Sequence, residues 1–183
     1  MNLIETFQNL VAQVPELVQP LIVALAGAVP FVEGEGAVTI GIIGGIPPII
    51  AAIAAIAGNL LCVVILVFAG ARARTAVVDR RRAKQAVAAD GVVVDDADAA
   101  FDDEPVSGRA AERRAKLTRA LDRYGVPGAS LLGPLLLPTM FTATMLVTLG
   151  IDKWRVIAWQ AVAIVGWTTL LTFVATGLIR VVA

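Results

Sequence analysis

The chain has 183 residues, 58% of them hydrophobic, and a mean hydropathy of +0.82. This composition excludes an ordinary soluble domain and places the chain in the integral membrane class. Its fifteen basic and fifteen acidic residues cancel, and it has no histidine, which excludes imidazole as a metal ligand or catalytic base.

The first predicted element is an amphipathic helix over residues 2–18. Asn2 and Glu5 resemble a capping box, in which two residues of the first turn exchange hydrogen bonds. Apolar residues then recur on one side of the helix: Leu3, Ile4, Phe7, Leu10, Val11, Val14, Leu17 and Val18. We expect this helix to lie in the membrane interface or to pack on the other helices as ordinary core.

The second predicted element, residues 20–45, is apolar but is interrupted by the sequence EGEG. In one spanning helix, Glu33 and Glu35 would lie near the centre of the bilayer. Each acid costs about 2.5–3.5 kcal/mol there if it faces lipid. The glycines on either side of the acids further weaken a continuous helix.

A re-entrant helical hairpin avoids these costs. Half-helix 20–31 would enter the membrane, residues 32–36 would turn at mid-depth, and half-helix 37–45 would return to the same side. Irregular backbone at mid-depth is tolerated where protein covers it or water reaches it. We therefore predict a hairpin, with a kinked full span as the alternative.

A full transmembrane span is predicted over residues 47–71. An uninterrupted helix of this length measures about 37 Å, enough to cross a bilayer with some tilt. Two prolines open the run, where a missing N–H does no harm. Cys62 is interpreted as a small buried hydrophobic residue. Asn59, in the middle of the span, is expected to hydrogen-bond to the backbone of a hairpin rather than contact a substrate.

A polar segment, residues 72–107, separates the two apolar halves. It begins as a basic helical extension of the first span and continues into an acidic stretch at 90–105, which we interpret as a flexible linker. The acidic spacing lacks an EF-hand pattern, so calcium binding is not expected. Twelve of the fifteen basic residues lie between Arg72 and Arg123. Since cytoplasmic loops are enriched in Lys and Arg, residues 72–124 are predicted to be cytoplasmic.

The second apolar half repeats the plan of the first. An amphipathic helix is predicted over 108–124, and a second hairpin over 126–150 with its turn at the sequence GPLLLP. A second span is predicted over 153–181. Asp152 stands immediately before this span and is the expected N-cap.

The two membrane halves are therefore residues 1–71 and 108–183. With the loop between them in the cytoplasm, their spans run in opposite directions, as in the inverted repeats of many secondary transporters. The predicted fold is an all-α integral membrane protein, an inverted repeat of amphipathic helix, re-entrant helical hairpin and transmembrane helix.

The first half resembles a signature of the small multidrug export protein family, which is related to the DedA-like (VTT-domain) membrane proteins. That signature has a Pro, a Glu three residues on, a Gly-Ala pair, a Gly-x-Pro-Pro and a later Gly-Asn. The matching residues are Pro30, Glu33, Gly36-Ala37, Gly45, Pro47-Pro48 and Gly58-Asn59. The second half resembles the other signature of the family more loosely, through the sequence RYG at 123–125, Pro134, Pro138, Gly150 and Gly166.

Two positions depart from the family pattern. Glu35 stands where the family often has a basic residue, and Pro138-Thr139 is not followed by the glycine or arginine common at the second turn. A carboxylate–guanidinium pair between the hairpin tips therefore cannot be carried over. The resemblance implies two re-entrant hairpins meeting at the midplane, and transport across the cell membrane of a bacterium. DedA-like relatives move lipids such as undecaprenyl phosphate between leaflets.

The residues expected to bind a proton or a substrate are Glu33, Glu35, Pro30, Gly36, Asn59, Pro138 and Thr139. An acid in low-dielectric surroundings, close to a second acid, binds a proton more readily than it does in water. Glu33 is therefore the predicted proton carrier, and Glu35 is its partner or a group facing water at the rim. Alternatively, one or both acids cap the N-terminus of the returning half-helix.

The function predicted from these residues is proton-coupled export of amphipathic, cationic small molecules, because the turns carry acids and no base. A DedA-like lipid flippase or scramblase is the first alternative, and a membrane scaffold that uses the basic loop is the second. No nucleophile–base set, metal cluster or phosphate loop points to an enzyme. The expected partners are membrane lipids, the substrate and a second copy of the chain. We expect no cofactor, metal or nucleic acid.

Overall fold

The computed structural model describes residues 3–89, 119, 121, 123–135 and 137–182. Its regular elements are helices, and no strand occurs in this part of the chain, which confirms the all-α class. The predicted linker, nearly all of the predicted helix at 108–124, and Asn2 of the predicted capping box lie outside the described residues.

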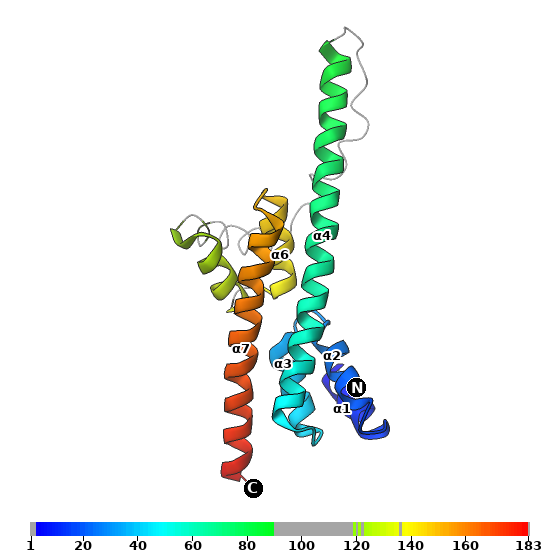
Figure 1. The fold of residues 1–183 in the computed structure, drawn as a ribbon, viewed down its shortest axis with the longest axis vertical. Coiled ribbons are helices and arrows are strands. Elements are labelled where there is room, and N and C mark those ends of the chain that lie inside the picture. The colour runs from blue at the N-terminus through cyan, green and yellow to red at the C-terminus, as the bar shows by residue number, and fades with distance from the viewer. Residues whose placement is uncertain (1–2, 90–118, 120, 122, 136, 183) are drawn as a thin grey trace.

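Two long helices form the axis of the molecule. α4 covers Pro48–Ala89 and α7 covers Lys153–Val182. They lie side by side and run in opposite directions (Figure 1). The sections Pro48–Arg80 and Lys153–Leu178 are long and apolar enough to cross a membrane. We call the end of the molecule where α7 begins the loop end, and the end where α4 begins the terminal end.

The contact between α4 and α7 at the loop end is formed by aromatic residues. The ring of Trp154 meets the ring of Phe68 edge-on, with centroids 5.6 Å apart, and Nζ of Lys153 lies 5.0 Å from the centroid of the Phe68 ring. Oδ1 of Asp152 accepts hydrogen bonds from the backbone N–H groups of Trp154 and Arg155, both at 3.0 Å. The prediction that Asp152 is the N-cap of α7 is therefore confirmed.

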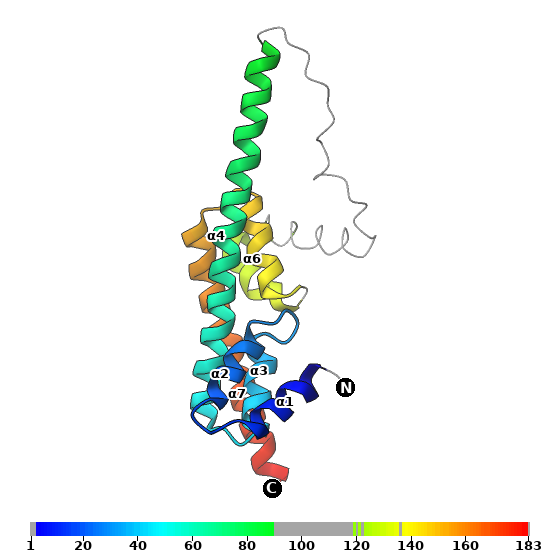
Figure 2. The ribbon, with the colours of Figure 1, turned by 90° about the vertical axis from the view of Figure 1, so that its right-hand side faces the viewer.

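The first half contributes three short helices to the terminal end, α1 (Leu3–Gln13), α2 (Gln19–Gly27) and α3 (Glu33–Ile43). α2 and α3 pack against each other and against α4, and α1 packs on both (Figure 2). α1 is shorter than the predicted helix 2–18, because Pro15 disfavours helical backbone in the residue before it.

The connection between α2 and α3 lies earlier in the chain than predicted. Residues 28–32 form it, whereas the EGEG sequence, predicted as the turn, forms the first turn of α3. Phe31 and Glu33 adopt left-handed backbone angles, with φ of 69° and 51°, so the chain reverses there without glycine. Gly34 serves packing instead: a Cβ atom built on it would lie 2.2 Å from Oγ1 of Thr168 in α7.

Small residues allow α2 and α4 to approach closely. A Cβ atom built on Gly58 would lie 1.8 Å from the backbone oxygen of Ala24, and one on Gly27 would lie 2.7 Å from the backbone oxygen of Ala55. Helices in membranes commonly associate through such small residues. The glycine of the Gly-Asn pair in α4 therefore has a packing role against α2.

The second half places a helix–turn–helix pair at the loop end. Residues 123–132 are helical, a short 3₁₀ turn (η1) covers Gly133–Leu135, and α6 covers Thr139–Thr148. The 3₁₀ turn falls in the sequence GPLLLP, where the turn of this pair was predicted, and one helix lies on either side of it. α6 packs against α4 and α7. The indole Nε1 of Trp167 in α7 donates a 3.0 Å hydrogen bond to the backbone oxygen of Leu131.

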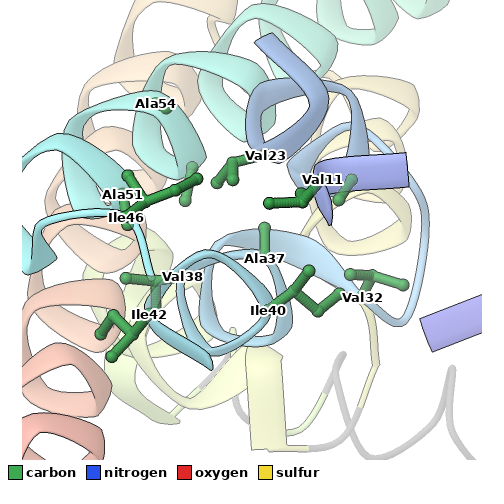
Figure 3. Packing of buried hydrophobic residues seen from close by; sticks show 12 residues of the cluster. Val11, Val23, Val32, Ala37, Val38, Ile40, Ile42, Ile46, Ala51 and Ala54 are labelled. Carbon is green, nitrogen blue, oxygen red and sulfur yellow. The ribbon is translucent and has the colours of Figure 1, made fainter. Parts of the chain in front are cut away.

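Two buried apolar clusters follow from this arrangement. The terminal-end cluster consists of Val11, Val23, Ala26, Val32, Ala37, Val38, Ile40, Ile42, Ile46, Ala51, Ala54 and Ala55 (Figure 3). The loop-end cluster consists of Val63, Val67, Val126, Ala129, Met140, Ala143, Leu146, Val147, Val156 and Ile164. Each cluster belongs to one half of the chain and to the adjoining lengths of α4 and α7.

Candidate functional site

Glu33 and Thr139 join the two halves of the chain in the interior. Their side chains are 6% and 1% exposed. Oγ1 of Thr139 donates a 2.8 Å hydrogen bond to Oε2 of Glu33, and the backbone N–H of Thr139 donates to Oε1 of the same carboxylate. The backbone amide of Met140 also interacts with this group. The buried acid therefore has several donors, and all of them come from the opposite half.

The Glu33 carboxylate caps the N-terminus of α6. Thr139 is the first residue of α6, and Pro138 at the N-cap position makes no capping hydrogen bond with its side chain. Free N–H groups at a helix N-terminus attract anions. The sequence-based alternative placed the acid at the N-terminus of its own returning helix. Glu33 does stand in the first turn of α3, but its carboxylate accepts its hydrogen bonds from the N-terminus of α6 in the other half.

Glu35 has different surroundings from Glu33. At about 100° per residue, two residues on α3 separate the two side chains by about 200°. Glu35 is half-buried, and its own backbone amide lies close to its carboxylate. Its charge still acts on Glu33 through space. The interpretation of the two acids as a proton-sharing pair therefore has no direct hydrogen bond between them to support it.

Pro30 and Gly36 shape the first helix pair. Pro30 is exposed in the connection between α2 and α3. Gly36 is half-buried in the first turn of α3, where an added Cβ atom would lie 3.1 Å from Cγ1 of Val32. Of the seven predicted site residues, Glu33, Pro138 and Thr139 meet at one point.

Asn59 in α4 is fully buried, but its side chain makes no hydrogen bond to any described residue. The prediction that it bonds to a hairpin backbone is therefore wrong. The backbone of Gly27 does pass close to this position, because a Cβ atom built on that glycine would lie 3.4 Å from the backbone nitrogen of Asn59. The close approach is made by the backbone of Asn59 and leaves the carboxamide unpaired.

Four further buried residues are polar: Ser130, Thr142, Gln160 and Thr168. Ser130, Gln160 and Thr168 were not singled out from the sequence. Within the described part of the chain the side-chain polar atoms of all four have no hydrogen-bond partner. An unpaired polar group in an apolar interior costs several kcal/mol. The sequence did carry a signal for two of them, since Gln160 and Thr168 are polar residues eight positions apart in an apolar span.

An exposed aromatic pair flanks the Glu33–Thr139 contact in both chain segments. Phe31 precedes Glu33 by two residues, and Phe141 follows Thr139 by two. Their side chains are 75% and 52% exposed, and their ring centroids lie 6.3 Å apart. The segments that meet through a buried carboxylate thus also meet through a pair of exposed rings.

Metal-binding chemistry has no candidate in the described ranges, which contain no group of three or more His, Cys, Asp or Glu side chains that could hold an ion. Comparison with known proteins gives no match, since no protein-family model, curated protein or solved structure is significantly similar to the chain. The resemblance to small multidrug export proteins therefore stays a prediction from the residues that carry it.

Proposed function

We propose that the protein is a membrane transporter in which Glu33 carries a proton and the contact between the two hairpins responds to it. The observation that carries this proposal is the buried Glu33 carboxylate, held by hydrogen bonds from Thr139 at the N-terminus of α6. Acids inside membrane proteins commonly belong to ion or proton pathways. Transporters place their sites where half-helix N-termini meet near the midplane.

In this proposal α4 and α7 are the spans, and the two helix pairs are re-entrant hairpins that enter from opposite sides. α2, α3 and α6 have 9, 11 and 10 residues. At ~1.5 Å per residue they measure about 14–17 Å, half of a ~30 Å bilayer core. The basic loop faces the cytoplasm of a bacterium, and the two halves form an inverted repeat.

Protonation of Glu33 would weaken the contact between the hairpins. A hydrogen bond to an ionised group contributes about 1.5–3 kcal/mol, against about 0.5–1.5 kcal/mol for a neutral pair. The two bonds donated by Thr139 would together lose roughly 2 kcal/mol when the carboxylate becomes neutral. Proton uptake would therefore favour separation of the two tips, and release would favour their closure.

A cationic amphiphile is the substrate class that the site favours. The contact contains a carboxylate, and the exposed rings of Phe31 and Phe141 attract cations through their faces. A lipid phosphate is the second candidate, because the α6 N-terminus that now binds Glu33 also suits a phosphate oxygen. The two candidate substrates carry opposite charges, so the Glu33 carboxylate would attract the cationic amphiphile and repel the lipid phosphate.

The test is transport in proteoliposomes that hold a pH gradient, with efflux of a cationic dye and lipid scrambling measured in parallel. We expect dye efflux that depends on the gradient, and loss of that dependence in Glu33→Gln. Glu16→Gln, an exposed acid on the connection before α2, is the matched control. Proton-dependent efflux that survives in Glu33→Gln would refute the role of Glu33. Scrambling without dye efflux would select lipid translocation.

A scaffold function makes a different prediction for the loop. Removal of residues 86–107 should leave transport intact if the protein is a transporter, since none of the groups in the Glu33 contact lies there. A scaffold that uses the loop should lose its activity with it. The measurement is the same dye efflux assay on the shortened chain.

A further inference from the structure

Buried polar side chains are distributed unevenly along the molecule. From the start of the described chain to Gly58, Glu33 is the one buried polar or charged side chain among residues whose burial is described. The interior beyond it toward the terminal end is the apolar cluster shown in Figure 3, with the hydroxyl of Thr168 in α7 lying beside Gly34 of α3. The remaining buried polar residues are Asn59, Ser130, Thr139, Thr142, Gln160 and Thr168.

The contact between Phe68 and Trp154 fixes where Asn59 and Gln160 lie. Asn59 is about 13 Å from Phe68 along α4, and Gln160 is about 9 Å from Trp154 along α7. Because the helices are antiparallel, Asn59 and Gln160 both lie on the terminal-end side of this aromatic contact. The two carboxamides therefore lie within about 5 Å of one level.

The same level holds the Glu33–Thr139 contact. Sγ of Cys62, one turn from Asn59 in α4, donates a 3.6 Å hydrogen bond to Sδ of Met140, which follows Thr139. Gln160 faces the interior, since it is fully buried on the side of α7 that holds Val156 and Ile164 of the loop-end cluster.

Two of the remaining buried polar residues, Thr142 and Ser130, lie next to this level in the helix pair of the second half. Thr142 is one turn along α6 from Thr139, and a Cβ atom built on Gly133 would lie 3.0 Å from its Oγ1. Ser130 is one turn before Gly133 and follows Ala129 of the loop-end cluster. Both hydroxyls are fully buried and unpaired within the described chain. The helix pair of the second half thus contains buried hydroxyls, and that of the first half does not.

The unpaired groups define the ligand chemistry. Both the amide nitrogen and the oxygen of Asn59 and of Gln160 lack a partner among described residues. A bare cation would leave the NH₂ groups unpaired, and an anion would leave the oxygens unpaired. Water donates and accepts, and buried waters typically bridge such groups. Water is therefore the ligand that satisfies this set completely.

We propose that Asn59, Gln160, Thr142 and Ser130 line a path for water and protons that connects Glu33 with the loop end, while the terminal-end cluster seals the opposite side. This inference rests on the proposed function and deepens it, because it names the side from which Glu33 exchanges its proton. Around Glu33, its own helix adds Glu35, and the described part of α6 has no charged side chain. The charged residues of α4 lie toward the loop end, from Arg72 onward, whereas α7 has Lys153 and Arg155 at the loop end and Arg180 near its terminal-end terminus.

The test is thiol accessibility in oriented vesicles. Cys62, the single native cysteine, is first replaced in Cys62→Ala. Gln160→Cys and Ser130→Cys then probe the path, and Val23→Cys and Val38→Cys, equally buried, probe the seal. The reagent is a trimethylammonium methanethiosulfonate, which does not cross membranes and reacts with the thiolate that forms in water.

We expect the two path variants to react at least about tenfold faster from the loop end than from the opposite side. From the loop end the reagent would reach a thiol in contact with water, whereas from the opposite side the terminal-end cluster would block it. A thiol in apolar surroundings stays protonated and inert. The two seal variants should not react from either side. Full reaction of all four in SDS verifies that each thiol is present. Path variants that react no faster than seal variants, or that react faster from the terminal end, would overturn the proposal.

A second measurement covers the case in which cysteine variants do not fold. Gln160→Leu keeps the size of the side chain and removes its hydrogen-bonding groups. If Gln160 serves the path, proton uptake after a pH jump, followed with pyranine in proteoliposomes, should slow several-fold. An unchanged rate in a folded Gln160→Leu protein would contradict the path. The labelling pattern does not depend on transport, so a failure of the proposed function in Glu33→Gln remains distinguishable from a failure of this inference.

Discussion

The hydrogen bond between Thr139 and Glu33 gives the most direct test of the contact between the halves. In Thr139→Val the hydroxyl is replaced by a methyl group of nearly the same size. The backbone N–H of residue 139 remains to donate to Oε1, so the change removes only the 2.8 Å bond to Oε2. Thr139 is almost completely buried, so the lost bond lies away from the molecular surface.

The expected loss follows from the charge of the acceptor. A bond to an ionised carboxylate contributes about 1.5–3 kcal/mol, so Thr139→Val should lower the free energy of unfolding by that amount. The assay is unfolding by SDS in mixed micelles, monitored by circular dichroism. Thr144→Val is the control, because Oγ1 of Thr144 bonds to carbonyl oxygens of its own helix. We expect the control to change stability by less than about 0.5 kcal/mol.

A double-mutant cycle with Glu33→Ala separates this bond from other effects of the substitution. If the two side chains interact as the structure has them, the double variant loses the bond once. Its total loss should then be smaller than the sum of the single losses, by about 1.5–3 kcal/mol. A coupling free energy below about 0.5 kcal/mol would refute the argument that this bond holds the two halves together.

Three further predictions concern packing and capping, and each is measured as a change in thermal unfolding. Gly58→Ala should destabilise the protein by about 1–3 kcal/mol, because the new Cβ meets backbone of α2, whereas Gly70→Ala, on the same helix with no atom within 4 Å, should be neutral or stabilise by up to about 1 kcal/mol. Equal effects of the two would contradict the close approach. Gly34→Ala should be destabilising alone and largely rescued when combined with Thr168→Ala, which removes the hydroxyl it would strike. Asp152→Ala should cost about 1 kcal/mol and Asp152→Asn much less, since asparagine also caps; equal losses would argue against an N-cap.

The sequence predicted the elements well where local rules decide them. α7 begins where Asp152 caps it, and α4 begins at paired prolines and continues through its basic extension. The turn of the second helix pair falls at GPLLLP, where prolines exclude regular helix. Each of these features depends on residues within one turn of helix, so composition and spacing were sufficient.

The first helix pair shows where local rules fail. Glycines in EGEG predicted the turn, but Gly34 is required because α7 approaches it and the turn is made by Phe31 and Glu33 in left-handed conformations. A glycine that relieves a close contact looks the same in the sequence as one that permits a turn. Only the position of Thr168, more than a hundred residues away, distinguishes the two cases.

By itself the sequence determined the all-helical class, the two long apolar helices and the broken segments between them, and it singled out Glu33 as a candidate site residue. The tertiary structure decided what Glu33 touches. Its partner is a threonine from the other half, and the helix it caps is not the one it begins. Likewise, the burial of Gln160 and the unpaired state of Asn59 depend on how α4 and α7 face each other. The physical reason is range: helix ends and apolar runs are set by neighbours in the chain, whereas the partner of a buried polar group is set by packing between distant segments.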